Sequence, residues 1–355
     1  MLSRRNWLSL ALAAPALAQT PTRWRSVLNI DNPGVLPRLF DACFLTPRIG
    51  LAAGIVLFPG VGSRQNTTFH TEDRGQTWVQ RKSPDIPLAL FALHESHVWM
   101  LGERRLWFSS DAGWTWRSSS RPRHAAGIHF LDPLHGFAFG GARVHRTTDG
   151  GRHWSAIPAS ADPLLPQDRQ WRLAAFSSPQ KGWIAGVAHL PPAPDARDPF
   201  GEPLTRAQRR DLRVPGLVLL QTTDGGATWI PSSCSAPGEI VSLLDQGDFL
   251  TCAFLGDSLS RFPGVVARAP IAGGSWRTLL QEEQLSVRDL LHHRGELHAA
   301  ADNQGRAEIL TLDSAGEWRH RPVHYTAQGH PCFLRGPQGA FWLWLDTGMI
   351  FAPVS

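Results

Sequence analysis

One short pattern occurs at least four times in the sequence, which limits the chain to folds built from copies of one structural unit. The pattern is Ser or Thr, any residue, Asp, any residue, Gly, any residue, Thr or His, and then Trp. Its copies are Thr71–Trp78, Ser109–Trp116, Thr147–Trp154 and Thr222–Trp229. A short carboxylate can accept hydrogen bonds from the N–H groups of its own turn, and glycine adopts backbone angles that other residues avoid. We therefore expect each copy, called an Asp turn below, to join two strands, with the Trp anchoring the second strand.

The residues that define the four Asp turns recur in every unit. A functional interpretation would make the aspartates catalytic carboxylates or calcium ligands. Recurrence in unit after unit instead favours a role in the scaffold. The expected structural residues are Asp73, Gly75 and Trp78; Asp111, Gly113 and Trp116; Asp149, Gly151 and Trp154; and Asp224, Gly226 and Trp229.

The spacing of the repeats predicts an all-β propeller. Trp78, Trp116 and Trp154 follow one another at 38 residues, and the 75 residues from Trp154 to Trp229 fit one unit with an insertion. A second pattern, F-x5-G-[LFW]-x-x-G, marks two further strands per unit, so each unit reads as four antiparallel strands. Units of about 40 residues with four strands are typical of propeller blades.

The number of units favours seven blades. The last units match the repeat pattern only weakly, so six or eight blades are the alternatives. Trp276 and Trp318 end two weaker copies, and the segment from Pro331 to Val354 has only three strands' worth of sequence. Thr22–Val27 reads like the missing last strand of a blade. We expect it to complete the seventh blade and close the ring, which leaves no open sheet edge.

The N-terminus has the features of an export signal. Ser3–Leu8 contains an Arg pair resembling the twin-arginine consensus, an apolar run follows, and Ala16–Ala18 offers a small-x-small cleavage site. An ordinary secretory signal with a chance Arg pair is the alternative. We expect residues 1–18 to be a signal peptide, residues 19–355 to be a single propeller domain, and the mature protein to be periplasmic or secreted.

The Asp turns resemble the Asp-box, or BNR, repeats of sialidases, sortilin-type receptors and related secreted propellers. Combined with F-x5-G-[FW]-x-x-G, they resemble more narrowly the photosystem II assembly/stability factor propellers, over essentially the whole mature chain. That resemblance implies a seven-bladed, exported, non-enzymatic protein that binds a membrane-protein precursor through an Arg-bearing face. Many bacterial relatives have no photosystem, so the resemblance does not identify the partner.

An extracellular sialidase-like glycoside hydrolase is the alternative function. Sialidase chemistry uses a Tyr nucleophile, an acid, an Asp and three Arg. The chain has one tyrosine, Tyr325, with no Glu near it in sequence. Arg48 is the nearest match to the arginine motif that sialidases have early in their sequences. Other glycosidases need two facing carboxylates. Asp132, Asp245, Asp289 and Glu239 fall in inner strands or turns, but the sequence does not pair any two of them.

The segment from His189 to Gly216 is the longest insertion, and we expect it in blade four on the face opposite the Asp turns. Pro59–Thr68 is expected to form a second excursion there. Thr205 is placed to cap a short helix over Thr205–Leu212. Connecting loops should bring further cations to that face, an anion-receptive surface for a protein or another acidic ligand. Self-paired, solubilising arginines are the alternative. The expected binding residues are Arg81, Lys82, Arg104, Arg105, Arg121, Arg123, Arg206, Arg209, Arg210 and Arg213, to which Arg117 and Arg197 are close in sequence.

The composition predicts neither a metal nor a cofactor. The net charge of +5 comes with no dense basic run, so nucleic acid is not an expected partner. No stretch outside the N-terminus is long and apolar enough to span a membrane, and a monomer is expected.

Cys43 and Cys332 share a register in blades that become neighbours on ring closure. They could form a disulfide, but buried free thiols are the simpler expectation for these two and for Cys234 and Cys252. His292-His293 lacks a third ligand at a known spacing.

Overall fold

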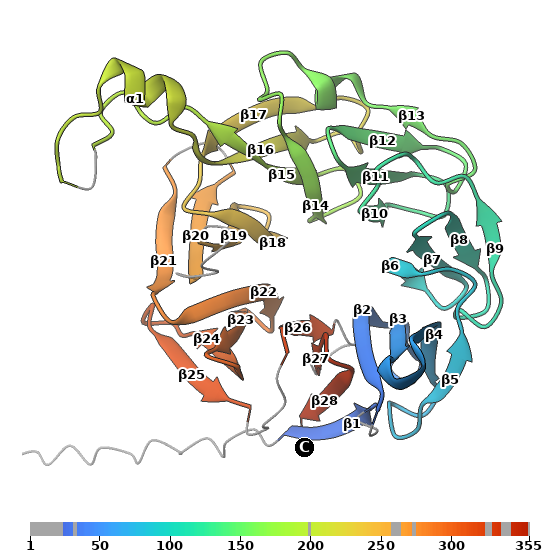
Figure 1. The fold of residues 1–355 in the computed structure, drawn as a ribbon. Coiled ribbons are helices and arrows are strands. Elements are labelled where there is room, and N and C mark those ends of the chain that lie inside the picture. Colours follow the sequence, from blue (N-terminus) through green and yellow to red (C-terminus); the bar gives the residue numbers. More distant parts are fainter. Residues whose placement is uncertain are drawn as a thin grey trace, which may run out of the picture.

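Seven sheets of four antiparallel strands form a closed ring around a central opening (Figure 1). The computed structural model describes residues 24–30, 34–197, 200–256, 264–271, 275–323, 329–334 and 342–353. The prediction of a seven-bladed propeller is therefore confirmed. The predicted signal peptide, Tyr325 and the worn Asp turn at 272–274 lie outside the described residues.

Blades one to three follow one another without crossover, each with its first strand innermost and its fourth at the rim. Blade one is β2 (Leu36–Phe44), β3 (Gly50–Phe58), β4 (Ser63–Thr71) and β5 (Val79–Lys82). Blade two is β6 (Pro87–His94), β7 (His97–Gly102), β8 (Leu106–Ser109) and β9 (Arg117–Ser119). Blade three is β10 (Gly127–Phe130), β11 (Gly136–Gly140), β12 (Arg143–Thr147) and β13 (Ser155–Ala156).

Blades four to six have the same strand order. Blade four is β14 (Gln170–Phe176), β15 (Gly182–Leu190), β16 (Val214–Thr222) and β17 (Ile230–Ser235). Blade five is β18 (Glu239–Asp245), β19 (Phe249–Leu255), β20 (Gly264–Pro270) and β21 (Arg277–Glu282). Blade six is β22 (Leu285–His293), β23 (Glu296–Asn303), β24 (Arg306–Leu312) and β25 (Trp318–Pro322).

Blade seven is made from both ends of the chain. It contains β26 (Pro331–Leu334), β27 (Trp342–Leu345) and β28 (Met349–Pro353), and its outer strand is β1 (Trp24–Asn29). Trp24 pairs with Pro353 and Asn29 with Met349 in antiparallel register. The predicted closing strand therefore exists, and it completes the four-stranded sheet of blade seven.

The apolar core is divided among the interfaces between blades. Each hydrophobic cluster found among the described residues contains residues of two neighbouring blades. Between blades two and three, for example, buried Trp99 stacks on Phe130 with ring centroids 3.9 Å apart. Strands of alternating or continuous apolar residues thus pack face to face around the whole ring, which makes every blade depend on its neighbours.

The two ends of the ring differ in what they carry. The Asp turns join third and fourth strands at one end, together with the turns between first and second strands. The opposite end, called the loop face below, carries the connections between second and third strands and between blades. On the loop face the short helix η1 (Pro59–Val61) joins β3 to β4, and η2 (Pro158–Ala161) lies between blades three and four. The expected excursion over Pro59–Thr68 is wrong in length, because β4 already begins at Ser63 and continues the pairing with β3.

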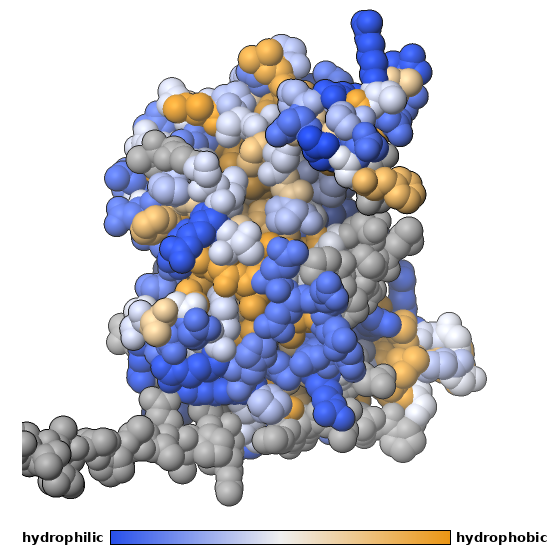
Figure 2. All heavy atoms as spheres, turned by 90° about the vertical axis from the view of Figure 1, so that its left-hand side faces the viewer, coloured by the Kyte–Doolittle hydropathy of each residue, from blue (hydrophilic) through white to orange (hydrophobic). Residues whose placement is uncertain are grey.

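The blade-four insertion contains the helix α1 (Arg206–Asp211) and stands out from the ring (Figure 1). The predicted cap is present: the Thr205 hydroxyl accepts from the Gln208 N–H, and the Gln208 side chain accepts from the Thr205 N–H. This reciprocal capping box satisfies N–H groups that a helix leaves unpaired at its start. In Figure 2 the top of the molecule, where Figure 1 places the insertion, is mostly hydrophilic and includes some hydrophobic residues. The described residues contain no helix long and apolar enough to span a membrane.

Candidate binding sites on the two faces and in the central channel

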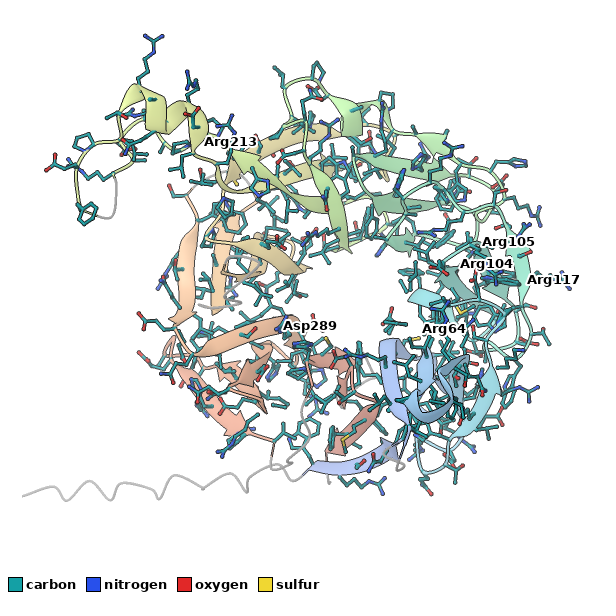
Figure 3. All side chains as sticks on the ribbon, in the orientation of Figure 1. Arg64, Arg104, Arg105, Arg117, Arg213 and Asp289 are labelled. Carbon is teal, nitrogen blue, oxygen red and sulfur yellow. The ribbon has the colours of Figure 1, made fainter. Side chains whose placement is uncertain are left out.

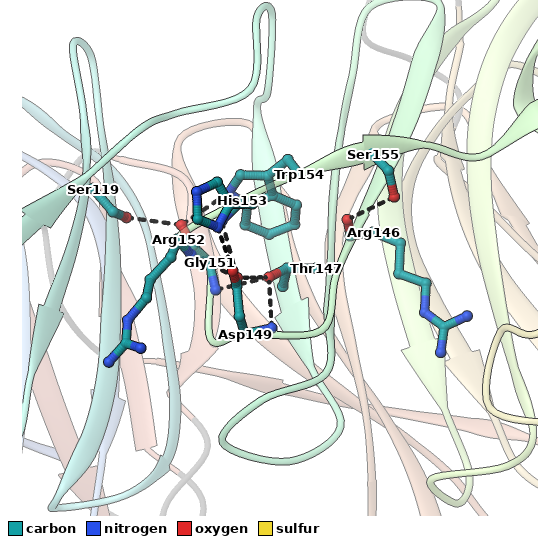
Figure 4. A network of polar contacts seen from close by, with 9 residues as sticks. All are labelled: Ser119, Arg146, Thr147, Asp149, Gly151, Arg152, His153, Trp154 and Ser155. Carbon is teal, nitrogen blue, oxygen red and sulfur yellow. Dashed lines mark hydrogen bonds and ion pairs between the residues drawn. The ribbon is translucent and has the colours of Figure 1, made fainter.

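The four Asp turns share one hydrogen-bond network, shown for blade three in Figure 4. The Thr147 hydroxyl donates to Asp149 and accepts from the Gly151 N–H, at 2.9 Å in both cases. The Asp149 carboxylate also accepts from the N–H groups of Arg152 and His153 and contacts His153 Nδ1 at 2.6 Å. The same carboxylate-centred bonds recur around Asp73, Asp111 and Asp224. The acceptor sites of these carboxylates are thus occupied by their own turns.

These hydrogen bonds keep the aspartates ionised. Bonds from the side chain and N–H of Thr77 lower the pKa of Asp73 to about 2, and those from Thr228 do the same for Asp224. Hydrogen bonds from the N–H and the ring of His153 lower the pKa of Asp149 in the same way. Among the described residues no group of three or more potential metal ligands comes together. The hydrogen bonds of the Asp-turn carboxylates are therefore made within the turns themselves.

The Gly and Trp of each Asp turn contact the preceding blade. Gly226 has φ +80°, and a Cβ there would lie 2.4 Å from the Phe137 ring of blade three. The Trp229 ring packs edge-on against Phe137, with centroids 5.2 Å apart. Glycine is thus needed both for the backbone conformation and for the close contact.

The innermost strands carry carboxylates that join neighbouring blades. Asp41 on β2 accepts from the Leu90 N–H of blade two at 2.8 Å. Asp289 on β22 accepts from the Phe333 N–H of blade seven at 3.0 Å and from the Ser242 hydroxyl of blade five at 2.9 Å. β-Bulges directly before Asp41, Ser242 and Asp289 shift the strand register and turn these side chains toward the next blade.

Asp41 and Asp289 border a central cavity of about 450 Å³. Arg288, Cys43 and Cys332 also line this cavity. A second cavity, of about 630 Å³, continues the channel toward the Asp-turn end, between His129, Phe176 and Asp245. Figure 3 shows Asp289 beside the central opening. The sequence predicted Asp289 as an inner-strand residue but missed Asp41. The two sites share a sequence signal, which is an Asp in the first strand of a blade followed by a small or apolar residue.

The other carboxylates considered from the sequence have separate partners. Glu239 accepts from Arg172 of blade four at 2.7 Å, and Asp132 forms an ion pair with His135 in its own turn. Asp245 accepts from the Ser177 hydroxyl at 2.9 Å. The structure does not set any two of Asp132, Asp245, Asp289 and Glu239 opposite each other as an unpartnered pair. They join strands and turns.

The thiols of Cys43 and Cys332 border the same cavity, and all four cysteines are free. Burial raises the pKa of each thiol, and the nearby Asp41 and Asp289 carboxylates add to this effect. The expected free thiols are thus present, although only Cys252 is a fully buried residue. His292 is exposed and borders the Asp-turn end of the channel, while the His293 ring packs near His298.

The predicted cationic residues fall into three separate groups. Arg81 and Lys82 lie in the outer strand β5 rather than in a connecting loop, and the Arg81 guanidinium lies 5.0 Å from the Trp114 ring centre. Arg104, Arg105, Arg121 and Arg123 surround the loop-face end of blade two, and Arg206, Arg209, Arg210 and Arg213 belong to the blade-four insertion. Figure 3 shows Arg213 on the opposite side of the central opening from Arg104 and Arg105. The sequence assigned all of these cationic residues to one face. In the folded ring the three groups lie at different places.

Several of these arginines hold backbone carbonyl groups. Arg121 donates to the carbonyls of Glu103 and Ala125, and burial lowers its pKa. Arg104 pairs with the buried carboxylate of Asp85, which also accepts from the N–H groups of Arg104 and Arg105. These bonds fix the turn between β7 and β8. Arg105 and Arg123 are exposed beside it.

The insertion is ordered by bonds within itself. Arg209 donates to the carbonyls of Leu204 and Pro194, and Arg213 donates to those of Arg210 and Leu212. Arg210 forms a two-bond ion pair with Asp211. Arg206 is exposed at the start of α1. The insertion therefore holds its shape with few bonds to the blade below it.

A groove of about 660 Å³, called the rim groove below, lies at the base of this insertion. One wall is the connection between blades three and four, including Leu164, whose exposed fraction is 88 %. The other wall is the end of β15 and Arg213. At its edge Asp168 accepts from the His189 N–H and contacts His189 Nδ1 at 2.6 Å. The sequence did not predict this groove, because its walls come from two loops that meet only in the folded ring.

Comparison with known proteins supports the fold. No family model and no curated protein matches the chain. Among solved structures, YCF48 bound to D1 peptide is 16 % identical with a TM-score of 0.63, covering 97 % of this chain and all of that one. YCF48 from Cyanidioschyzon merolae is 14 % identical with a TM-score of 0.63, covering 93 % and 98 % of the two chains. An inactive virginiamycin B lyase from Staphylococcus aureus with quinupristin is 12 % identical with a TM-score of 0.61, covering 94 % and 99 %. At these identities the similarity shows a shared propeller architecture, which occurs in both binding proteins and enzymes.

Proposed function

We propose that this protein is a non-enzymatic, exported propeller that binds a protein partner through its loop face, in the manner of an assembly or stability factor. The observation that carries the proposal is the blade-four insertion, which presents the exposed Arg206 on α1 and contributes Arg213 to the rim groove. Exposed apolar surface next to cations is a common composition for a protein-binding site.

The order within the insertion supports a binding role. The capping box at Thr205 and the carbonyl bonds of Arg209 and Arg213 fix its backbone before any partner arrives. A surface that is already ordered loses less conformational entropy on binding. A propeller of the same architecture has been solved with a bound peptide, which supports peptide or protein recognition as a use of this fold.

The interior carboxylates favour binding over hydrolysis. Asp41, Asp289 and Glu239 each accept hydrogen bonds from a neighbouring blade. Glycosidases need one acid to donate a proton and a second carboxylate across the substrate. The interblade bonds instead commit these groups to holding the ring together.

Capture of partners by the tagged mature protein tests the binding role. Chemical cross-linking in envelopes of the native organism, followed by quantitative mass spectrometry, should enrich a small set of proteins. Leu164→Asp and the double change Arg206→Glu with Arg213→Glu should each reduce that enrichment about tenfold or more, as expected for loss of an interface anchor. Arg48→Glu, an exposed arginine at the Asp-turn end, is the matched control and should leave it unchanged.

Two results would contradict the proposal. One is an identical set of captured proteins for the wild type and the loop-face variants. The other is turnover of fluorogenic sialosides or polysaccharides by the purified protein, especially if Tyr325→Phe abolishes it, since that would identify a sialidase-like hydrolase.

The export step rests on the sequence of residues 1–18 alone and has its own test. Cell fractionation should place the protein outside the cytoplasm with a new N-terminus near Gln19. Changing Arg4 and Arg5 to Lys should retain it inside, as expected for twin-arginine export. Unchanged export of that variant would favour the general secretory route.

A further inference from the structure

The groove between blades one and two, at the Asp-turn end, is filled by an aromatic ring of the chain itself. Trp114, directly after the Gly of the blade-two Asp turn, stacks on His70 with ring centroids 4.6 Å apart and planes at 21°. Its Nε1 donates to Glu72, and the Arg81 guanidinium lies over the ring at 5.0 Å. A flat ring in contact with another ring and a cation is a favourable arrangement.

The same place between blades three and four is filled differently. Arg146 occupies the position that His70 has in blade one, directly before the Thr of the Asp turn. Its Nη1 donates to the Gly226 carbonyl of blade four at 3.3 Å. Ala227, in the position of Trp114, adds no ring. Here the chain's own guanidinium bridges the two blades.

Between blades two and three the equivalent place is a pocket of about 340 Å³. Phe108 replaces His70 and Arg152 replaces Trp114. Trp99 Nε1 donates to the Gly150 carbonyl at 3.2 Å and the Ser119 hydroxyl to the Gly151 carbonyl at 2.9 Å, so the backbone of the Asp turn is already satisfied. The space that Trp114 fills between blades one and two is therefore open here.

The walls of this pocket are aromatic. Phe108 lies 5.3 Å from Trp99 and 5.7 Å from His97, measured between ring centroids. Burial, together with the nearby His94, lowers the pKa of His97, so its imidazole is uncharged at neutral pH. Leu134 of blade three, half exposed, completes the apolar lining.

The rim of the pocket is cationic. Arg117 on β9 and Arg152 on the blade-three Asp turn are both exposed and border the pocket. In Figure 4 the Arg152 side chain extends from its turn toward the strand that carries Ser119, which belongs to blade two. The lining also includes the carboxylate of Asp149, which is already hydrogen-bonded to His153 of its own turn. Two guanidinium groups thus border an aromatic cavity of a size that suits one small ring system.

We propose that this pocket binds an aromatic ring bearing a carboxylate, with the ring against Phe108 and the carboxylate at Arg117 and Arg152. The contacts of Trp114 with His70 and Arg81 show, within this chain, how a ring is accommodated at the equivalent position. Arginine forks match carboxylates in geometry and charge. Such a ligand is either a free aromatic acid or the C-terminal aromatic residue of a peptide.

Isothermal titration of the mature protein with three probes tests the proposal. N-acetyltryptophan carries both ring and carboxylate and should bind. N-acetyltryptophanamide, which lacks the charge, and N-acetylleucine, which lacks the ring, should each bind more weakly by about tenfold or more. A peptide ending in Trp with a free carboxylate distinguishes the two sources: tighter binding than N-acetyltryptophan assigns the site to a peptide end, and equal binding to a free acid.

Three variants make the test specific to the pocket. Arg152→Gln and Arg117→Gln should each weaken N-acetyltryptophan binding about tenfold. Arg152→Trp should recreate the filled groove of blades one and two and abolish binding while the protein stays folded. Arg64→Gln, an exposed arginine on β4 that Figure 3 shows in a different part of the ring from Arg117, should have no effect.

The proposal is overturned by any of three findings. These are no saturable binding of N-acetyltryptophan up to its solubility limit, equal binding of the amide, and unchanged binding by Arg152→Trp. Circular dichroism and unfolding of each variant confirm that it is folded, so that loss of binding reports on the pocket itself. The rim groove is on the opposite face, and a failure here leaves the proposed partner binding untouched.

Discussion

Asp41 of blade one accepts a 2.8 Å hydrogen bond from the backbone N–H of Leu90 in blade two, and this bond links the two blades at the wall of the central channel. Asp289 makes the equivalent bond to the Phe333 N–H of blade seven. Both carboxylates follow a β-bulge in the innermost strand. A bulge, which often marks a functional site, here serves ring assembly.

Removing either carboxylate should destabilise the ring without affecting ligand binding at the surface. Asp41→Ala and Asp289→Ala each leave a backbone N–H without its acceptor, so we expect a loss of about 1–3 kcal/mol in the free energy of unfolding. Asp41→Asn retains an acceptor oxygen and should lose less. Urea unfolding followed by tryptophan fluorescence measures both, with the exposed Asp248→Ala as control. Equal stability of Asp41→Ala and the control would show that the interblade bond contributes nothing.

The Asp turns should contribute to stability and not to metal binding. Asp224→Ala removes the acceptor for the Thr228 N–H and for two hydroxyl groups, and we expect a lower melting temperature than that of the wild type. A chelator should leave the melting temperature of the wild type unchanged. A fall in melting temperature with chelator that is absent in Asp224→Ala would instead indicate a bound cation at the turn.

Two buried histidines should make the protein less stable in moderate acid. Burial lowers the pKa of His70 and of His298 to about 4. In the unfolded chain both titrate near the ordinary value of 6.5, so between about pH 6.5 and 4 the unfolded state binds more protons and stability falls as the pH falls. We expect a decline of about 1–3 kcal/mol per histidine over this window.

Unfolding by urea at a series of pH values measures that slope. Asp73 and Asp224, whose pKa values are lowered to about 2, affect stability in a lower pH range. In the unfolded chain both carboxylates take up a proton near pH 3.8. Their contribution to the stability of the folded protein is therefore lost as the pH falls from 3.8 toward 2. His70→Gln should flatten the slope above pH 4 and leave the lower range unchanged. An unaltered slope in that variant would assign the acid sensitivity to other groups.

The cavity thiols should be unreactive while the ring is folded. Because burial raises the pKa of Cys43 and Cys332, little thiolate is present near neutral pH. Iodoacetamide should label them slowly in buffer and completely in denaturant, as followed by mass spectrometry. A reductant should not change the melting temperature, since all four cysteines are free. A lower melting temperature after reduction would reveal a disulfide in the protein.

The sequence by itself determined the architecture. The four Asp turns, three of them at a spacing of 38 residues, predict the turn between the third and fourth strands of a blade, and the Thr22–Val27 segment predicts how the ring closes. These features are local: a carboxylate, a glycine with positive φ and a Trp act within eight consecutive residues, so a linear pattern records them. The Thr205 cap is local in the same way, and it too was predictable.

Only the tertiary structure decided which surfaces can bind. The predicted cationic face separates into groups around the ring, with Arg81 turned toward Trp114 of the next blade. The rim groove and the pocket at Phe108 each lie between two blades or loops, and their walls come from residues distant in the chain. The physical reason is that a propeller repeats its scaffold locally but builds every cavity from neighbouring units. Whether a given place is filled, as by Trp114, or open, as beside Arg152, depends on two units packed together.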